Sequence, residues 1–186
     1  GALKTFEKIP SINSFFYEFY SMGAVRHGDY IAKVRVIPTE QTKNAITQKD
    51  IDLDSAEWPY RKGIIKEIAQ KNLTFELQIQ LCKNLKEMPV NDLTKEWSQE
   101  LSPFRTVAKI TIPKQTVPED GNFEIMENLS FTPFRTIEEN SPIGNLQRSR
   151  QSAYVTSSTS RHELNHKKRK EPKNLEEAFS PEFYQL

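Results

Sequence analysis

Three segments of the chain alternate between apolar and polar residues with the period of two that a half-buried β-strand requires. They cover residues 32–36, 73–81 and 108–112, and a proline follows closely after the first and the third. A turn at 118–121 precedes a fourth, shorter alternation at 123–127. The pattern predicts four strands, each with one face turned toward a core.

Two other parts of the chain are predicted to be helical. Between the first two strands, three isoleucines fall on one helix face, Asp54 or Ser55 could cap that helix, and Pro59 suits its first turn. A second helix is predicted over residues 146–158, after an extended segment at 130–141 that contains Pro133 and is followed at once by Pro142. Helices that interrupt strands without regular alternation indicate the α+β class.

The second predicted helix carries the most informative pair of residues. A spacing of four puts Arg150 and Tyr154 on one helix face, within reach of each other. A fixed cation close to a phenol favours the deprotonated phenolate. A phenolate oxygen is a strongly donating ligand for ferric iron, and tyrosine is the proximal haem ligand of catalases. This spacing recurs by chance in ordinary helices, so its meaning depends on the surrounding motifs.

Those motifs follow one another in a definite order along the chain. They are Asp-Leu-Thr-Lys-x-Trp at 92–97, a strand within 103–112, Glu-x-x-x-Phe-x-Pro at 127–133, Leu-Gln at 146–147, Arg150 with Tyr154, and Arg-His at 161–162. The order resembles the C-terminal half of a haem catalase, more closely the small catalase-like peroxidases than the long-chain enzymes. Residues 27–33 and 73–81 resemble barrel strands of the same family more weakly.

The resemblance implies a catalase-like antiparallel β-barrel, partial in this chain, with a crossing loop, a haem-ligand helix and additional helices. In such a fold Tyr154 would bind the iron of haem b, and Arg150 would keep its phenolate ionised. Phe131 would face the proximal side of the ring, and Arg161 would bind a haem propionate. Arg148 is a rival to Arg150, because the chain has one extra residue before the pair, but only Arg150 has the spacing of four.

Catalases also place a distal histidine over the haem in an early segment. The three histidines of this chain, His27, His162 and His166, all lie in segments that match later parts of the family. We therefore expect a fragment of a longer peroxidase that acts on hydrogen peroxide or organic hydroperoxides, inactive by itself and homo-oligomeric by family analogy. The alternative is a non-catalytic catalase-like remnant that serves in binding or assembly.

A second metal motif competes with the haem assignment. His162, Glu163 and His166 match the H-E-x-x-H pattern in which two histidines bind zinc and the glutamate activates water. Glu176 or Glu177 could supply a third ligand. The basic residues on both sides of the motif would place positive charge beside the metal, which argues against zinc proteolysis.

Charge and composition narrow the class of partner. The chain has 26 basic and 25 acidic residues, so neither nucleic acid nor a membrane surface is favoured as a partner. It contains no long apolar run and no signal pattern, which favours the cytoplasm unless a targeting signal precedes this segment. Its one cysteine, Cys82, excludes an internal disulfide. We expect one partial haem-binding domain at 1–165 and a polar tail at 166–186.

Overall fold

The computed structural model describes residues 11–54, 57–117, 129–168, 172–174, 176–177 and 180. The chain divides into two compact units, each assembled from separate segments. The first, here called the sheet unit, comprises Gly1–Met22, Ala32–Lys83 and Trp97–Glu119. The second, the helix unit, comprises Gly23–Ile31, Asn84–Glu96 and Asp120–Leu186.

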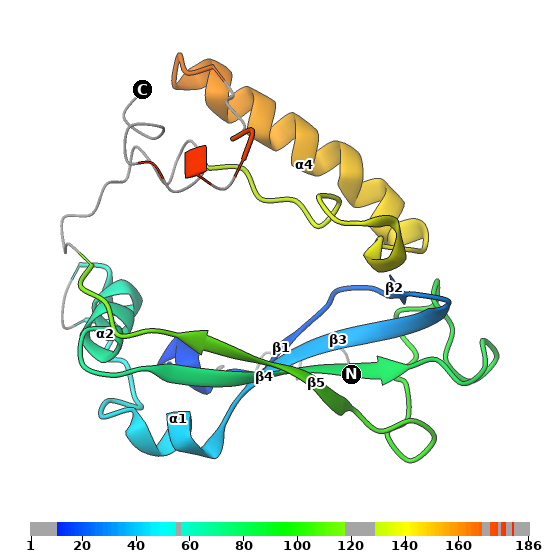
Figure 1. The fold of residues 1–186 in the computed structure, drawn as a ribbon, viewed down its shortest axis with the longest axis horizontal. Coiled ribbons are helices and arrows are strands. Elements are labelled where there is room, and N and C mark those ends of the chain that lie inside the picture. The colour runs from blue at the N-terminus through cyan, green and yellow to red at the C-terminus, as the bar shows by residue number, and fades with distance from the viewer. Residues whose placement is uncertain are drawn as a thin grey trace. The chain divides into compact units, whose positions relative to one another are not determined.

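The described strands form one antiparallel sheet that is not closed into a barrel (Figure 1). The strand order is β1-β3-β4-β5, and β2 pairs with β3 in addition. The bounds are Phe19–Tyr20 for β1, Val25–His27 for β2, Tyr30–Pro38 for β3, Leu73–Leu81 for β4 and Arg105–Ile112 for β5. The three long strands are those that the alternation predicts.

The register of β3 and β4 separates an apolar face of the sheet from a polar one. Val34 lies opposite Ile79, whereas Lys33 lies opposite Gln80. The polar face is nevertheless covered at Gln80, which is only 1% exposed. Its amide donates to the carbonyl oxygens of Trp97 at 3.0 Å and Ser102 at 2.8 Å, which satisfies the buried group.

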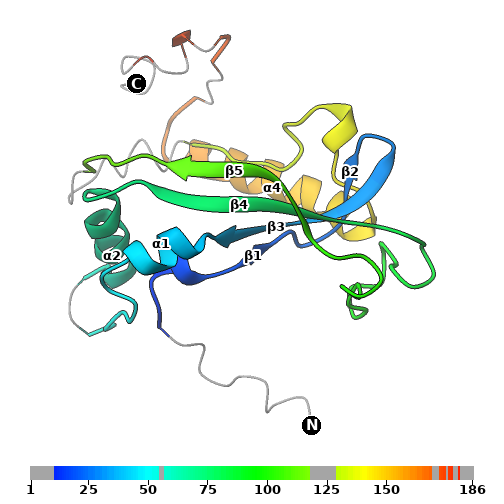
Figure 2. The ribbon, with the colours of Figure 1, turned by 60° about the horizontal axis from the view of Figure 1, so that its bottom comes forward.

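The core of the sheet unit lies where β3 ends and β4 begins, beside helices α1 (Glu40–Ala45) and α2 (Pro59–Ile68) (Figure 2). Phe15 and Phe75 pack there with ring centroids 6.0 Å apart. Of the aromatic residues near the N-terminus, Phe15 is buried in this core, whereas Phe19 and Tyr20 are both more than half exposed. The buried cluster consists of Phe15, Ile46, Ile68, Leu73 and Phe75.

Helix α2 has Pro59 in its first turn, as predicted, but its cap differs from the prediction. The N-cap is Trp58, with a left-handed φ of 59° and no side-chain hydrogen bond, so capping by Asp54 is wrong. Gly63 lies in the middle of α2, where an added Cβ would come within 2.8 Å of Ile51 Cδ1. The glycine therefore serves the close approach of the helix to the preceding loop.

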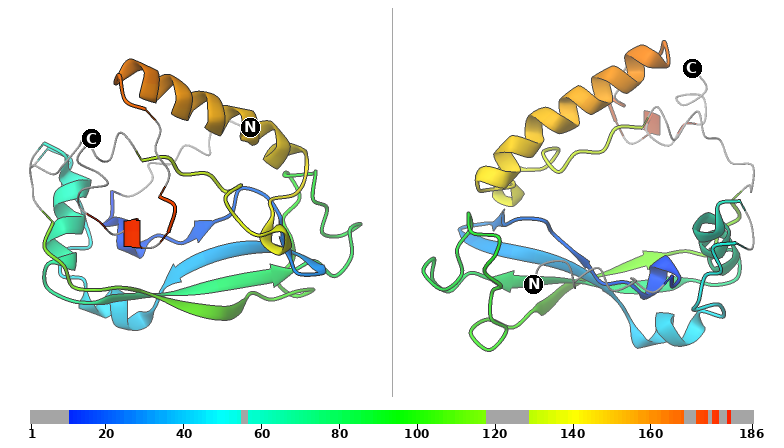
Figure 3. Two further views of the ribbon diagram at one scale, coloured as in Figure 1. Left: turned by 45° about the horizontal axis from the view of Figure 1, so that its top comes forward. Right: turned by 180° about the vertical axis from the view of Figure 1, so that it is seen from behind.

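The long helix of the helix unit is α4, which runs from Asn145 to Leu164 and so extends beyond the predicted 146–158 (Figure 3). A short 3₁₀ helix, η3 (Glu138–Asn140), precedes it. The strand expected at 123–127 and most of the expected tail lie outside the described residues. No helix in the described part of the chain is long and apolar enough to cross a bilayer.

Candidate functional site

The start of α4 is fixed by the loop at 84–96 of the same unit. Gly144, the N-cap, has φ 95° and ψ 166°, a conformation open essentially to glycine alone. The side-chain oxygen of Asn91 accepts a hydrogen bond from the Asn145 backbone N–H at 2.8 Å. An added Cβ at Gly144 would lie 2.8 Å from Val90 Cγ1. Backbone conformation and close packing together determine where the helix begins.

The segment before α4 is also tied to β2. The Ile143 N–H donates to the Ala24 carbonyl at 3.0 Å, and the Arg26 N–H donates to the Ser141 carbonyl at 2.8 Å. The Arg26 guanidinium adds an ion pair with Glu138 at 2.9 Å. These contacts hold the segment just before α4 against residues that precede it by more than one hundred positions.

Arg150 and Tyr154 meet on one face of α4, as their spacing predicts. Arg150 Nη2 donates to the Tyr154 hydroxyl oxygen at 2.7 Å, and its Cζ lies 5.3 Å from the centroid of the tyrosine ring. Both side chains are half-buried. Because a guanidinium carries only donors, the Tyr154 oxygen is the acceptor of this bond.

A third residue of α4 completes this arrangement. Gln147 Oε1 accepts a hydrogen bond from Arg150 Nη1 at 2.8 Å. The arginine is thus held at both ends of its guanidinium, by an amide on one side and by the phenol on the other. In the sequence, Gln147 is distinguished only as part of the Leu-Gln motif, so its contact with Arg150 was not predicted.

The loop that precedes α4 runs back along the C-terminal half of the helix (Figure 3). Arg161 Nη2 donates to the Leu129 carbonyl at 2.6 Å, and the hydroxyls of Ser130 and Ser158 lie 2.5 Å apart. Phe131 follows in this loop with 74% of its surface exposed. The structure therefore places Phe131 and Arg161 in the same unit as the Arg150–Tyr154 pair.

No family model matches the chain, and no curated protein matches it by sequence. Solved structures do match. A fungal catalase superposes with a TM-score of 0.63 over 82% of this chain at 20% identity, and catalase A from Saccharomyces cerevisiae with 0.61 over 95% at 20% identity. The fold is catalase-like. This chain spans 32% and 41% of the lengths of those two catalases.

The catalase-like fold agrees with the α+β class and the antiparallel sheet predicted from the motifs. The barrel character is only partial, because the described sheet remains open. At 20% identity the likeness concerns the fold and does not extend to the roles of individual residues.

Arg148 does not compete with Arg150 for Tyr154. The side chain of Arg148 is exposed and bonds to Asn145 Oδ1, one turn earlier on α4. The tyrosine oxygen receives its guanidinium contact from Arg150. The contact present is therefore the one that the spacing of four predicts.

The zinc motif does not assemble in the described residues. Helix α4 ends at Leu164, and His166 follows with a left-handed φ of 53°, so the two histidines do not share a helix face. His162 is 5% exposed, and its Nδ1 lies 2.7 Å from the Ser158 carbonyl oxygen. Among the described residues, no three His, Cys, Asp or Glu side chains gather as a metal site would require.

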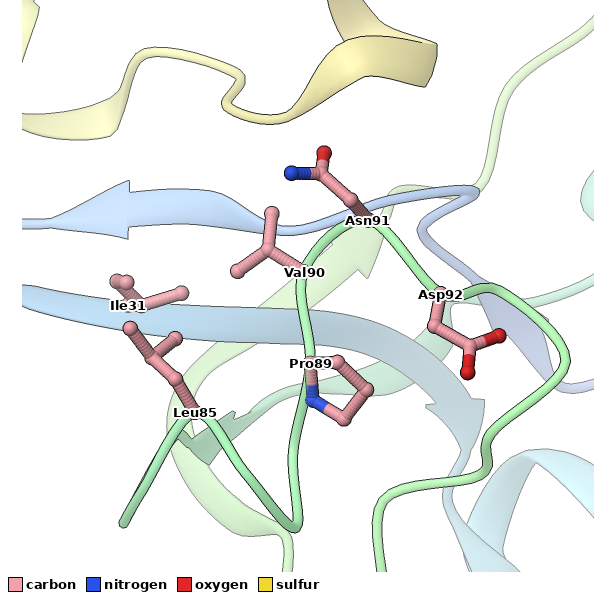
Figure 4. Close-up of a pocket in the computed structure, with 6 residues that line it drawn as sticks. All are labelled: Ile31, Leu85, Pro89, Val90, Asn91 and Asp92. Atoms are coloured by element: carbon pink, nitrogen blue, oxygen red, sulfur yellow. The ribbon is translucent and has the colours of Figure 1, made fainter.

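A shallow, mostly apolar hollow of about 540 Å³ lies in the helix unit (Figure 4). Asn91, at its rim, is the residue that caps α4. Asp92 accepts hydrogen bonds from the Thr94 hydroxyl at 2.6 Å and the Thr94 N–H at 3.1 Å, which lower the pKa of the aspartate below its usual value. The hollow is lined by Ile31, Leu85, Pro89, Val90, Asn91 and Asp92.

Proposed function

We propose that this chain is the proximal, haem-binding part of a catalase-like peroxidase, with Tyr154 as the iron ligand. The observation that carries the proposal is the 2.7 Å hydrogen bond from Arg150 to the Tyr154 oxygen. Because the guanidinium can only donate, the phenol oxygen must accept, and Arg150 would place its positive charge beside that oxygen when it binds the iron. An anionic tyrosine oxygen is a ligand that ferric haem takes.

The surroundings of the pair fit a haem iron better than a bare metal ion. Both side chains are half-buried, so the charge-assisted bond is less weakened by water than at an open surface. The described residues offer no cluster of three metal-binding side chains that would hold an ion without a porphyrin. The pair supplies a single oxygen ligand, to which Arg150 donates a hydrogen bond. A metal ion bound there would need its other ligands from elsewhere, as haem iron has them from the porphyrin.

Two further residues of the helix unit have proposed roles toward the cofactor. The exposed ring of Phe131 is available to pack on the porphyrin face. Arg161 is half-buried and donates one guanidinium hydrogen bond to the Leu129 carbonyl. Its positive charge would pair with a propionate.

Haem, when bound, supplies the redox chemistry that splits hydrogen peroxide or reduces an organic hydroperoxide. The chain's own part would be to offer the Tyr154 oxygen to the iron and to hold that oxygen in place through Arg150. Since the chain spans 32% of one matching catalase and 41% of the other, peroxide turnover and any homo-oligomer are proposed for the whole protein. Haem binding is proposed for this part.

The decisive experiment is an absorbance titration of the purified chain with hemin. We expect saturable uptake with the spectrum of a high-spin ferric tyrosinate, and we expect Tyr154→Phe to abolish that spectrum. Tyr60→Phe is the matched control, because Tyr60 lies on α2 of the sheet unit and is 38% exposed. Identical uptake and spectra in Tyr154→Phe and wild type would overturn the assignment.

A further inference from the structure

Gln147 is the most deeply buried polar residue near the candidate site. Only 3% of its surface is exposed, although it lies in the first turn of a helix whose other faces are polar and open. A buried amide is stable only when its oxygen and nitrogen both find partners. The positions of those partners indicate what the residue does.

The amide of Gln147 lies between a cation and a carbonyl group. Its oxygen accepts from Arg150 Nη1 at 2.8 Å, and its nitrogen is 3.5 Å from the Ala24 carbonyl oxygen, a long contact in a buried place. Reversing the amide would turn its NH₂ group toward the guanidinium and its oxygen toward the carbonyl. Both contacts would become repulsive, so both partners require the same orientation.

Packing against Gly23 fixes the rest of the glutamine side chain. A Cβ added at Gly23 would lie 3.1 Å from Gln147 Nε2 and 3.2 Å from its Cδ and Cγ. The glycine backbone therefore lies directly against the amide. Gln147 has little freedom to follow Arg150 if the arginine moves, and so it acts as a fixed point.

We propose that Gln147 is a positioning residue that holds the Arg150 guanidinium against the Tyr154 oxygen. An arginine side chain has many rotamers, and one hydrogen bond to a phenol does not select among them. A second bond, to the opposite Nη atom, fixes the plane and the direction of the planar guanidinium. The consequence for haem ligation rests on the proposed function, whereas the hold on Arg150 does not.

The hold can be measured without haem, by NMR of the full chain. Rotation about the Arg150 Cζ–Nε bond exchanges the two Nη groups, and hydrogen bonds at both groups slow it. We expect Gln147→Met, which keeps length and flexibility but loses the amide acceptor, to speed this rotation about tenfold. The signal is assigned by its loss in Arg150→Lys.

Gln151→Met is the matched control, with the same substitution at an exposed position next to Arg150. We expect Arg150 rotation in that variant to equal that of wild type. Equal rotation in Gln147→Met, in wild type and in the control would overturn the positioning role.

Gln147→Glu decides the matter if Gln147→Met loses its helical circular dichroism. A carboxylate keeps the acceptor toward Arg150 and strengthens it, although its second oxygen replaces the NH₂ group that faces the Ala24 carbonyl at 3.5 Å. Because the charge-assisted bond to the guanidinium outweighs that long contact, Arg150 rotation should slow about threefold or more. Unchanged rotation in this variant would count against the proposal as firmly as an unchanged Gln147→Met.

A hemin titration of the same variants separates this inference from the proposed function. If wild type binds hemin through Tyr154, we expect Gln147→Met to weaken binding about tenfold and Gln151→Met to leave it unchanged. Faster Arg150 rotation in Gln147→Met, together with a wild type that takes up no hemin, would keep the positioning role and overturn the cofactor assignment. Hemin affinity unchanged in Gln147→Met would overturn the link between the two.

Discussion

At the scale of single residues, Glu67 shows what a buried charge requires. Its side chain is fully buried, and Oε1 accepts hydrogen bonds from the Thr47 hydroxyl at 2.7 Å and from the Thr47 and Gln48 N–H groups at 3.1 Å. Lys71 Nζ lies 3.2 Å from Oε2. Burial alone would raise the pKa of Glu67, but the bonds from Thr47, Lys71 and Gln48 together lower it.

This depressed pKa predicts a pH dependence of stability. Because the carboxylate titrates lower in the folded chain than in the unfolded one, its contribution is present above the ordinary value of 4.5 and is lost as pH falls through the folded pKa. Glu67→Gln should cost about 2 kcal/mol at pH 7 and flatten the curve below about pH 5. Urea unfolding at several pH values measures both effects.

Glu40→Gln, at an exposed carboxylate of the same unit, is the control for this prediction. Parallel curves of stability against pH for Glu67→Gln and wild type would contradict it.

The two arginines at the start of α4 give a second test at this scale. Arg150→Ala should leave some hemin bound, with altered iron ligation and about tenfold weaker affinity, because the charge-assisted bond to Tyr154 is lost. Arg148→Ala should change neither, since Arg148 bonds to Asn145. Hemin titrations followed by absorbance compare the two variants. A larger loss in Arg148→Ala would show that the wrong arginine had been chosen.

At the candidate site, the sequence predicts side-chain contacts within one helix but not those between distant segments. The contact between Arg150 and Tyr154 was predictable, because helix geometry alone brings residues four apart together. The roles of Gln147 and Asn91 were not predictable. Their contacts with Ala24 and Asn145 depend on how distant segments fold together, and no local pattern encodes that.

At the scale of elements, alternation predicted where strands occur but not how their faces are covered. The predicted strands at 32–36, 73–81 and 108–112 correspond to β3, β4 and β5. The same alternation predicts an exposed Gln80, which is in fact buried by the segment at 97–102. The start of α2 was misjudged because a left-handed Trp58 cap leaves no sequence signal of the usual kind.

The glycine at the start of α4 gives a prediction for that element. Gly144→Ala should destabilise the chain by about 2–3 kcal/mol, because it adds a contact with Val90 to an already disfavoured backbone conformation. Gly28→Ala is the control: Gly28 also has a positive φ, of 62°, but an added Cβ would meet nothing within 4 Å. Gly28→Ala should lower the free energy of unfolding by about 1 kcal/mol. Thermal unfolding compares them, and equal costs would exclude a role for the contact with Val90.

At the scale of the whole molecule, the chain has a catalase-like fold in which the described sheet is open. The motif order predicted a partial barrel, and the described sheet ends at β1 on one side and β5 on the other. Each compact unit is assembled from segments that are far apart in sequence. No shift in composition marks where one unit passes into the other, so this division could not be read from the sequence.

The open sheet predicts self-association. β5 is an edge strand of the described sheet, and its Val107 and Ile110 are 48% and 38% exposed. Exposed apolar edge strands pair readily with other chains, and a lysine at the edge opposes such pairing. We expect light scattering to show an apparent mass that rises with concentration, and Val107→Lys to reduce the rise. Leu164→Lys, at the exposed end of α4, should not, and equal reduction by both would point to charge alone.

The tight fit between Gly23 and the Gln147 amide has a consequence for related sequences. Any side chain at position 23 would intrude on the amide, whose nearest atom would lie 3.1 Å from the new Cβ. A Cβ at 23 would require the amide to shift by a few tenths of an ångström, so relatives with alanine or serine at 23 should favour a shorter residue at 147. Positions 23 and 147 should therefore covary among related sequences. They are distant along the chain, since Ala24, next to Gly23, precedes Gln147 by 123 positions.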